Sequence, residues 1–169
     1  MTVSVQEADF DAGAEIVALS RGRDDVGAVA SFVGLVRADK ATGGTVSAGT
    51  QSAGAGDTAA VAAMTLEHYP GMTEKALQGI VAEARGRWNI FGVRVIHRIG
   101  RLLPGDRIVL VAVASAHRGD AFAACEFIMD YLKTRAPFWK KEETSGGGRW
   151  VEARDADDHA AGRWETDRR

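Results

Sequence analysis

Cationic side chains gather at the two ends of a helix that the sequence predicts between residues 119 and 136. His117 and Arg118 precede this helix, and Lys133 and Lys140 lie near or beyond its end. An arginine presents a planar fork of donors to a phosphate, and a histidine exchanges a proton near neutral pH. A lysine that is crowded by cations and partly desolvated becomes available as a base or a nucleophile. The cluster therefore indicates proton-transfer or nucleophilic chemistry on an anionic substrate.

The predicted helix has one apolar face, which favours packing on a core. Its apolar residues recur at three- and four-residue spacing and are Ala121, Phe122, Cys125, Ile128, Met129 and Leu132. Lys133 falls at the margin of this face, so its ammonium group is expected to line a cleft beside the core. Pro137 cannot continue the helix, so residues 138–141 leave it as a separate arm. Lys133 and Lys140 converge only if this arm folds back, and Lys141 on its own is explained as a solvated surface charge.

His117 and Arg118 lie at a junction between a strand and a helix. The free backbone N–H groups and the positive end of the helix dipole at such a junction favour an anion. The alternative, that both residues only cap and solvate the start of the helix, is equally consistent with the sequence. Arg37 directly follows the apolar strand expected at 27–36, at its C-terminal end. Crowding by Arg37, Arg118 and Lys140 would disfavour the ammonium form of Lys133.

The elements that must position these residues predict an α+β fold with a mostly antiparallel sheet and packed helices. The predicted strands are 2–5, 27–36, 61–68, 91–99 and 107–115, with a further short strand at 150–151, and the predicted helices are 11–19 and 72–88 besides the one described above. Residues 108–114 form an unbroken apolar run, which is typical of a central strand covered on both faces. His97 shares a face with Val95 and is expected to be a hydrogen-bonded core residue.

Composition favours one domain of an intracellular protein. The chain has 169 residues, 46% of them hydrophobic, and a net charge of −2, which argues against a protein that coats nucleic acid. A single cysteine excludes an intramolecular disulfide and a cysteine-only metal site. The first residues have no signal-peptide pattern and no apolar run is long enough to span a membrane, so we expect a cytoplasmic protein.

Two segments differ in composition from the rest of the chain. Residues 38–60 are dominated by Gly, Ala, Ser and Thr, which is typical of a flexible loop. Residues 149–169 are polar but include Trp150 and Trp164, which a merely disordered tail seldom needs. We therefore expect a single catalytic domain over 1–148 and a C-terminal segment that packs on a partner or on a second copy.

Four separate segments, in order along the chain, carry a resemblance to a known family. They are LEHYPGMTEKAL at 66–77, IHRIGRLLPGD at 96–106, SAHR at 115–118 and FIMDYLKTRAPFWKKE at 127–142. Together they resemble the large, catalytic subunit of molybdopterin synthase, the MoaE family, from about Gly27 to Trp164. The resemblance implies an α/β hammerhead fold and a homodimer within a heterotetramer.

The resemblance also implies a reaction, a partner and roles for residues. A sulfurtransferase of this family moves sulfur from the C-terminal glycine thiocarboxylate of a small ubiquitin-like subunit to cyclic pyranopterin monophosphate, which forms the molybdopterin dithiolene. Lys133 and Lys140 would be catalytic, without a metal or another cofactor. The expected substrate-binding residues are Arg37, His117, Arg118, Lys141 and Arg154. Arg154 would reach the site of the neighbouring subunit. Cys125, on the apolar face, looks like a core residue, so the sulfur must come from elsewhere.

Two other functions remain open from residue chemistry alone. A non-catalytic module would use the same basic cleft to bind an acidic or glycine-ended peptide tail. A different phosphate-handling enzyme would require a divalent metal or a nucleotide. The nearest acidic cluster is Asp155, Asp157 and Asp158, which a solvated tail explains better than a metal site does.

Overall fold

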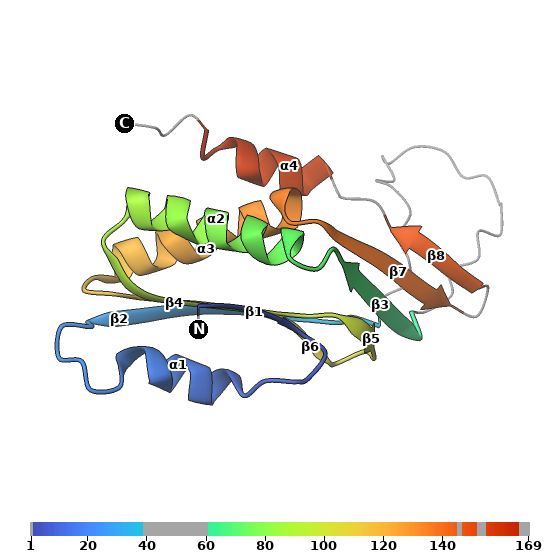
Figure 1. The fold of residues 1–169 in the computed structure, drawn as a ribbon, viewed down its shortest axis with the longest axis horizontal. Coiled ribbons are helices and arrows are strands. Elements are labelled where there is room, and N and C mark those ends of the chain that lie inside the picture. The colour runs from blue at the N-terminus through green and yellow to red at the C-terminus, as the bar shows by residue number, and fades with distance from the viewer. Residues whose placement is uncertain (1, 39–60, 145–146, 152–154, 166–169) are drawn as a thin grey trace, which may run out of the picture.

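The computed structural model describes residues 2–38, 61–144, 147–151 and 155–165, and Figure 1 shows their arrangement. Its elements in chain order are β1 (Val3–Gln6), α1 (Ala12–Ser20), β2 (Ala28–Leu35), β3 (Ala63–His68), α2 (Met72–Arg87), β4 (Ile90–Arg98), β5 (Gly100–Leu102), β6 (Arg107–Ser115), α3 (Arg118–Arg135), β7 (Phe138–Thr144), β8 (Gly147–Val151) and α4 (Asp155–Gly162). The expected α+β class is confirmed.

The first sheet has the strand order β1-β4-β6-β2 and forms the middle layer of the molecule. β6 pairs antiparallel with both β2 and β4, and only the β1–β4 pair is parallel. Helices α2 and α3 cover one face and α1 covers the other (Figure 1). The apolar run of β6 reflects this placement, because Val111 belongs to the core under α2 and α3 while Leu110 and Ala112 pack towards α1. The prediction of a central strand covered on both faces is confirmed.

A second sheet, with the order β5-β3-β7-β8, lies beside the first. Its pairs are all antiparallel. The arm expected after Pro137 is therefore strand β7, which pairs with β3 in the register His68 with Phe138 and Leu66 with Lys140. Residues 100–102, which lie outside the predicted strands, form the edge strand β5. These pairings join segments far apart in the chain, so local sequence patterns do not reveal them.

Four aromatic rings join α2, α3 and the end of the chain. The ring centroids of Trp88 and Trp164 both lie within 5.6 Å of Phe127, and the Tyr131 ring lies 4.5 Å from it, all edge-to-face. Ala161 of α4 is buried in the same core. Trp164, which we expected to pack on a partner or a second copy, thus packs on its own chain, whereas Trp150 is half exposed.

Phe122, which the sequence assigns to the apolar face of its helix, is 65% exposed instead. Met72, at the start of α2, is 56% exposed. Phe122 lies on the side of α3 that faces β2. Because β2 is the edge strand of its sheet, no further strand of the described chain packs against this side of the helix. Among the described residues, no helix has the length and the apolar character needed to cross a lipid bilayer.

Candidate active site

A cleft of about 370 Å³ lies between β2 and α3. It is lined by Ala30, Ser31 and Phe32 on the strand and by Phe122, Cys125, Glu126, Met129, Asp130 and Lys133 on the helix. The helix residues recur every three or four positions, so they share one flank of α3. Lys133 is an exposed residue of the last full turn before the helix ends at Arg135. The structure therefore places its side chain at one end of a cleft with largely apolar walls.

The thiol in the cleft wall is not a ready nucleophile. Cys125 is 6% exposed, and its Sγ lies 3.7 Å from the carbonyl oxygen of Val111. Burial, aided by the nearby Glu126 carboxylate, raises the pKa of the Cys125 thiol to about 11. The group is thus a neutral thiol at neutral pH. This agrees with the expectation that Cys125 is a core residue and that any transferred sulfur comes from another molecule.

Two carboxylates on the helix wall are held by the C-terminal segment of the chain. Arg163 Nη2 lies 2.7 Å from Glu126 Oε1 and 2.7 Å from Asp130 Oδ2, and Trp164 donates from Nε1 to the same Asp130 oxygen at 2.8 Å. Asp130 lies one helical turn before Lys133 and shares its flank. Neither carboxylate was expected from the sequence to belong to the site. Their only signal was the four-residue spacing of Glu126 and Asp130 on the flank that also bears Lys133.

The neighbouring lysines of β7 belong to different surfaces because side chains alternate along a strand. Lys140 is half-buried, and its Nζ lies 3.0 Å from Oε1 of Glu142, a buried residue two positions along the strand. Lys141 Nζ instead lies over the ring of Trp150, 5.8 Å from its centroid. Only Lys140 is on the face that carries the buried residues of the second sheet.

Arg37 follows β2 at the end of the sheet where β6 begins. Val36 N donates to the carbonyl oxygen of Asp106 at 2.9 Å, and Gly105 N donates back to Val36 O at 2.8 Å. These two bonds fix the backbone next to Arg37, whose side chain is exposed.

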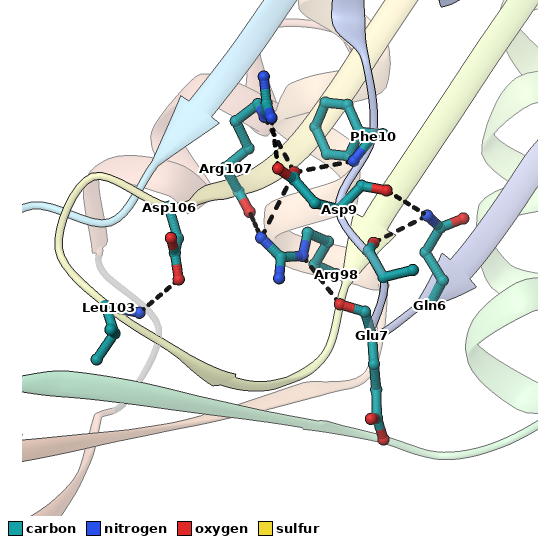
Figure 2. Close-up of polar contacts among 9 residues, drawn as sticks. Gln6, Glu7, Asp9, Phe10, Arg98, Leu103, Asp106 and Arg107 are labelled. Carbon is teal, nitrogen blue, oxygen red and sulfur yellow. Dashed lines mark hydrogen bonds and ion pairs between the residues drawn. The ribbon is translucent and has the colours of Figure 1, made fainter.

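A network of polar contacts holds the turn beside Arg37, as Figure 2 shows. Asp9 pairs with the guanidinium of Arg107, and Asp106 accepts a bond from Leu103 N at 2.7 Å. Arg98 donates to the carbonyl oxygens of Glu7 and Arg107, both at 3.1 Å. The pairing with Arg107 lowers the pKa of the Asp9 carboxyl to about 2. The β1–α1 connection is thereby tied to the start of β6.

His117 and Arg118 lie at the opposite end of the sheet. His117 is the N-cap residue of α3, with extended backbone, and both side chains are exposed. Lys133 lies fifteen positions along the helix from Arg118, which is about 22 Å at 1.5 Å per residue. Within one chain, Arg118 therefore does not crowd Lys133, contrary to the expectation above. The cause is that α3 runs back along the sheet from the end of β6, so its last turn lies at the end where Arg37 lies.

A family model described as "MoaE protein" matches residues 5–135. The chain belongs to the MoaE family. It is 58% identical over 163 residues to a molybdopterin synthase catalytic subunit of Ralstonia nicotianae, which covers 96% of this chain and 84% of that protein. It is 53% identical over 165 residues to the protein of the same name from Pseudomonas aeruginosa, covering 98% and 99% of the two chains.

A solved MoaE structure has the same fold. The molybdopterin biosynthesis MoaE protein of Burkholderia ambifaria superposes with a TM-score of 0.74, is 54% identical and covers 97% of each chain. The expected family membership is confirmed, and the names of these relatives favour a catalytic subunit over a binding module.

Two predictions about this MoaE-family chain concern other parts of the site. Arg154 and most of the loop expected at 38–60 lie outside the described residues. In the part of the chain that the structure describes, His, Cys, Asp and Glu side chains form no group of three or more that could hold a metal ion.

Proposed function

We propose that this chain transfers sulfur from the C-terminal glycine thiocarboxylate of a small ubiquitin-like subunit to cyclic pyranopterin monophosphate, forming the dithiolene of molybdopterin. The observation that carries the proposal is Lys133 at the end of a cleft whose only thiol is buried and protonated. Membership of the MoaE family and relatives named as catalytic subunits support it.

The two candidate catalytic lysines, Lys133 and Lys140, have distinct roles in this proposal. Lys133 attacks or activates the terminal carbonyl of the small subunit, so that the carbon–sulfur bond breaks as the sulfur bonds to the substrate and water releases the glycine as a carboxylate, or it assists proton transfer in this step. Lys140 neutralises negative charge on the thiocarboxylate and the substrate, and the low-dielectric surroundings of a half-buried ammonium strengthen that effect. The apolar walls of the cleft suit an extended glycine tail, because glycine has no side chain to accommodate.

We further propose that two copies of the chain form each complete site. His117 and Arg118, the candidate phosphate-binding pair, lie about 22 Å along α3 from Lys133, so one small substrate does not bridge them within a single chain. A second copy related by a two-fold axis supplies its own His117 and Arg118 to the Lys133 end of the first. The homodimer carries two small subunits, which makes a heterotetramer, and we place its action in the cytoplasm.

The edge strand β2 supports such a pairing of copies. Phe32, Val33 and Leu35 are 42%, 36% and 52% exposed on this edge, where an apolar strand invites pairing with another chain. Antiparallel pairing of two β2 strands puts the start of one beside the end of the other. Because Ala28 pairs with Ser115, the start of β2 lies next to the start of α3. The second copy's Arg118 would then approach the Lys133 end of the first.

The first test mixes the protein with cyclic pyranopterin monophosphate and a thiocarboxylated small subunit and measures dithiolene product for wild type and Lys133→Ala. Product from the wild type and its loss in the variant, with small-subunit binding intact, are expected. Normal product from a folded Lys133→Ala protein would reject the catalytic assignment. Tight binding without product from the wild type would favour the peptide-binding module instead.

A complementation test addresses the composite site. Lys133→Ala and Arg118→Ala proteins, each with little activity, are unfolded together and refolded as a mixture. Random pairing gives about half mixed dimers with one intact site of two, so about a quarter of wild-type activity returns. A mixture that stays as inactive as its components would show that each chain builds its own site.

A further inference from the structure

The corner between α3 and β7 connects the two candidate catalytic lysines. α3 ends at Arg135 and β7 begins at Phe138, so only Ala136 and Pro137 lie between them. Lys133 is in the last turn before the corner, and Lys140 is the third residue of the strand after it. The relative placement of their ammonium groups therefore depends on how firmly this corner is held.

Thr73, from the first turn of α2, holds the corner by a directed hydrogen bond. Its side chain is fully buried, and its Oγ1 donates to the carbonyl oxygen of Pro137 at 3.0 Å. The same Oγ1 accepts a bond from Tyr69 N at 3.1 Å. A hydroxyl has a single proton and a backbone N–H can only donate, so Thr73 Oγ1 accepts from Tyr69 N and donates its proton to the carbonyl oxygen of Pro137. This bond joins segments 64 residues apart in the chain.

His97, from β4 of the first sheet, holds the other side of the corner. Its ring stacks on Phe138 with the ring centroids 3.8 Å apart and the planes 18° from parallel. Its Nδ1 lies 2.8 Å from the carbonyl oxygen of Arg98, which can only accept, so the proton of the neutral ring is on Nδ1. Burial lowers the pKa of His97 to about 4, which keeps the ring neutral at neutral pH.

We propose that Thr73 and His97 are positioning residues that set Lys133 and Lys140 in their working arrangement. The inference rests on the proposed catalytic roles of the two lysines. Neither Thr73 nor His97 lines the cleft, so both act through the corner: one fixes the carbonyl of Pro137 and the other fixes the ring of Phe138. Because these contacts come from α2 and from β4, they tie the corner to two elements that do not line the cleft.

The chemical consequence follows from the geometry of group transfer. Displacing a reacting group by about 1 Å can cost on the order of 100-fold in rate, even when the displacement originates away from the chemistry. Loss of the hydrogen bond from Thr73 to Pro137 lets the corner move without changing any group that contacts the C-terminal tail of the small subunit. Such a change lowers kcat while KM for the small subunit stays the same, because binding of the tail to the cleft is retained.

Thr73→Val tests the inference, because valine keeps the shape of threonine and removes the hydroxyl, and Thr73→Ser restores a hydroxyl. Turnover is measured for folded wild type and variants with the thiocarboxylated small subunit. We expect kcat of Thr73→Val to fall about 10-fold or more with KM within about 2-fold, and Thr73→Ser to recover at least about half of the wild-type kcat. His97→Leu, which removes the stacked ring, is expected to lower kcat in the same way.

The matched control is Thr134→Val, which removes a threonine hydroxyl whose bond, 3.1 Å to the carbonyl oxygen of Asp130, stays within α3. It should leave kcat near the wild-type value. Normal kcat in Thr73→Val, an equal loss in Thr134→Val, or no recovery in Thr73→Ser would each overturn the inference. A separate result tests the proposed function: full activity of Lys133→Ala would reject it. If Lys133→Ala loses activity but Thr73→Val has a normal kcat, only the positioning role is rejected.

Discussion

Lys140 and Lys141 are neighbours on β7, yet one forms an ion pair with Glu142 and the other lies over the ring of Trp150. The alternation of side chains along a strand separates them, so that two adjacent ammonium groups serve different surfaces. This separation gives the two lysines different expected contributions to catalysis.

Lys140→Ala is therefore expected to reduce product formation on the order of 100-fold, because a charge that stabilises developing negative charge is lost. Lys141→Ala should cost no more than about 3-fold, because its ammonium lies on the other face of β7, over Trp150. Dithiolene formation at saturating small subunit compares the two variants. Equal losses in both would contradict the separation of the two faces. Circular dichroism checks that both variants are folded, since Lys140→Ala also leaves the buried Glu142 without this ammonium partner.

Trp164→Ala should lower the free energy of unfolding by about 3 kcal/mol, because an aromatic side chain leaves a packed cluster and Asp130 loses its indole donor. Urea denaturation of the isolated chain measures this change. Trp150→Ala is the matched control: its ring is half exposed, so a change within about 0.5 kcal/mol is expected. Similar unfolding midpoints for Trp164→Ala and wild type would contradict packing of the C-terminal segment on its own chain.

The stability of the protein should fall on acidification from pH 6.5 to about 4, partly through His97. The pKa of His97 is lowered from 6.5 to about 4 in the fold because the buried ring is desolvated. Between these values the unfolded chain binds the proton and the folded one does not, so stability rises with pH, by roughly 3 kcal/mol across the whole interval. Urea denaturation at several pH values measures the slope.

His97→Phe keeps an aromatic ring against Phe138 and removes the titrating group, so it should flatten that slope. His68 lowers the pKa of His97 further by charge repulsion and lies 3.6 Å from Glu74. It is unchanged in His97→Phe, so any pH dependence of stability that His68 itself contributes remains in this variant. An unchanged slope in His97→Phe would mean that other groups account for the pH dependence.

Asp9→Asn should lower the unfolding midpoint at pH 7, because the pairing with Arg107 that ties the β1–α1 connection to β6 is lost. The pKa of Asp9 is lowered from 3.8 to about 2. Its contribution is thus complete above pH 3.8 and disappears as the pH falls through 2. The midpoints of wild type and Asp9→Asn should therefore converge in strong acid. A constant difference down to pH 2 would exclude this carboxylate as its source.

The sequence by itself determined the family and the main local elements, but not β5 or α4. The apolar spacing of residues 121–132 and the break at Pro137 placed α3 to within a residue of its ends, and the apolar run at 108–114 identified the central strand. These signals are local, because helix and strand periodicity depends on residues a few positions apart. The four matching segments identified the MoaE family, which the comparisons confirmed.

Only the tertiary structure decided how the cations are grouped. The sequence placed Arg118 and Lys133 in one cluster, but α3 carries them to opposite ends of the sheet. The pairing of β7 with β3, the cleft between β2 and α3, and the contacts of Thr73 and His97 with the corner all join segments distant in the chain. No local pattern encodes such contacts, because they form only when separately folded elements bury their apolar faces against one another.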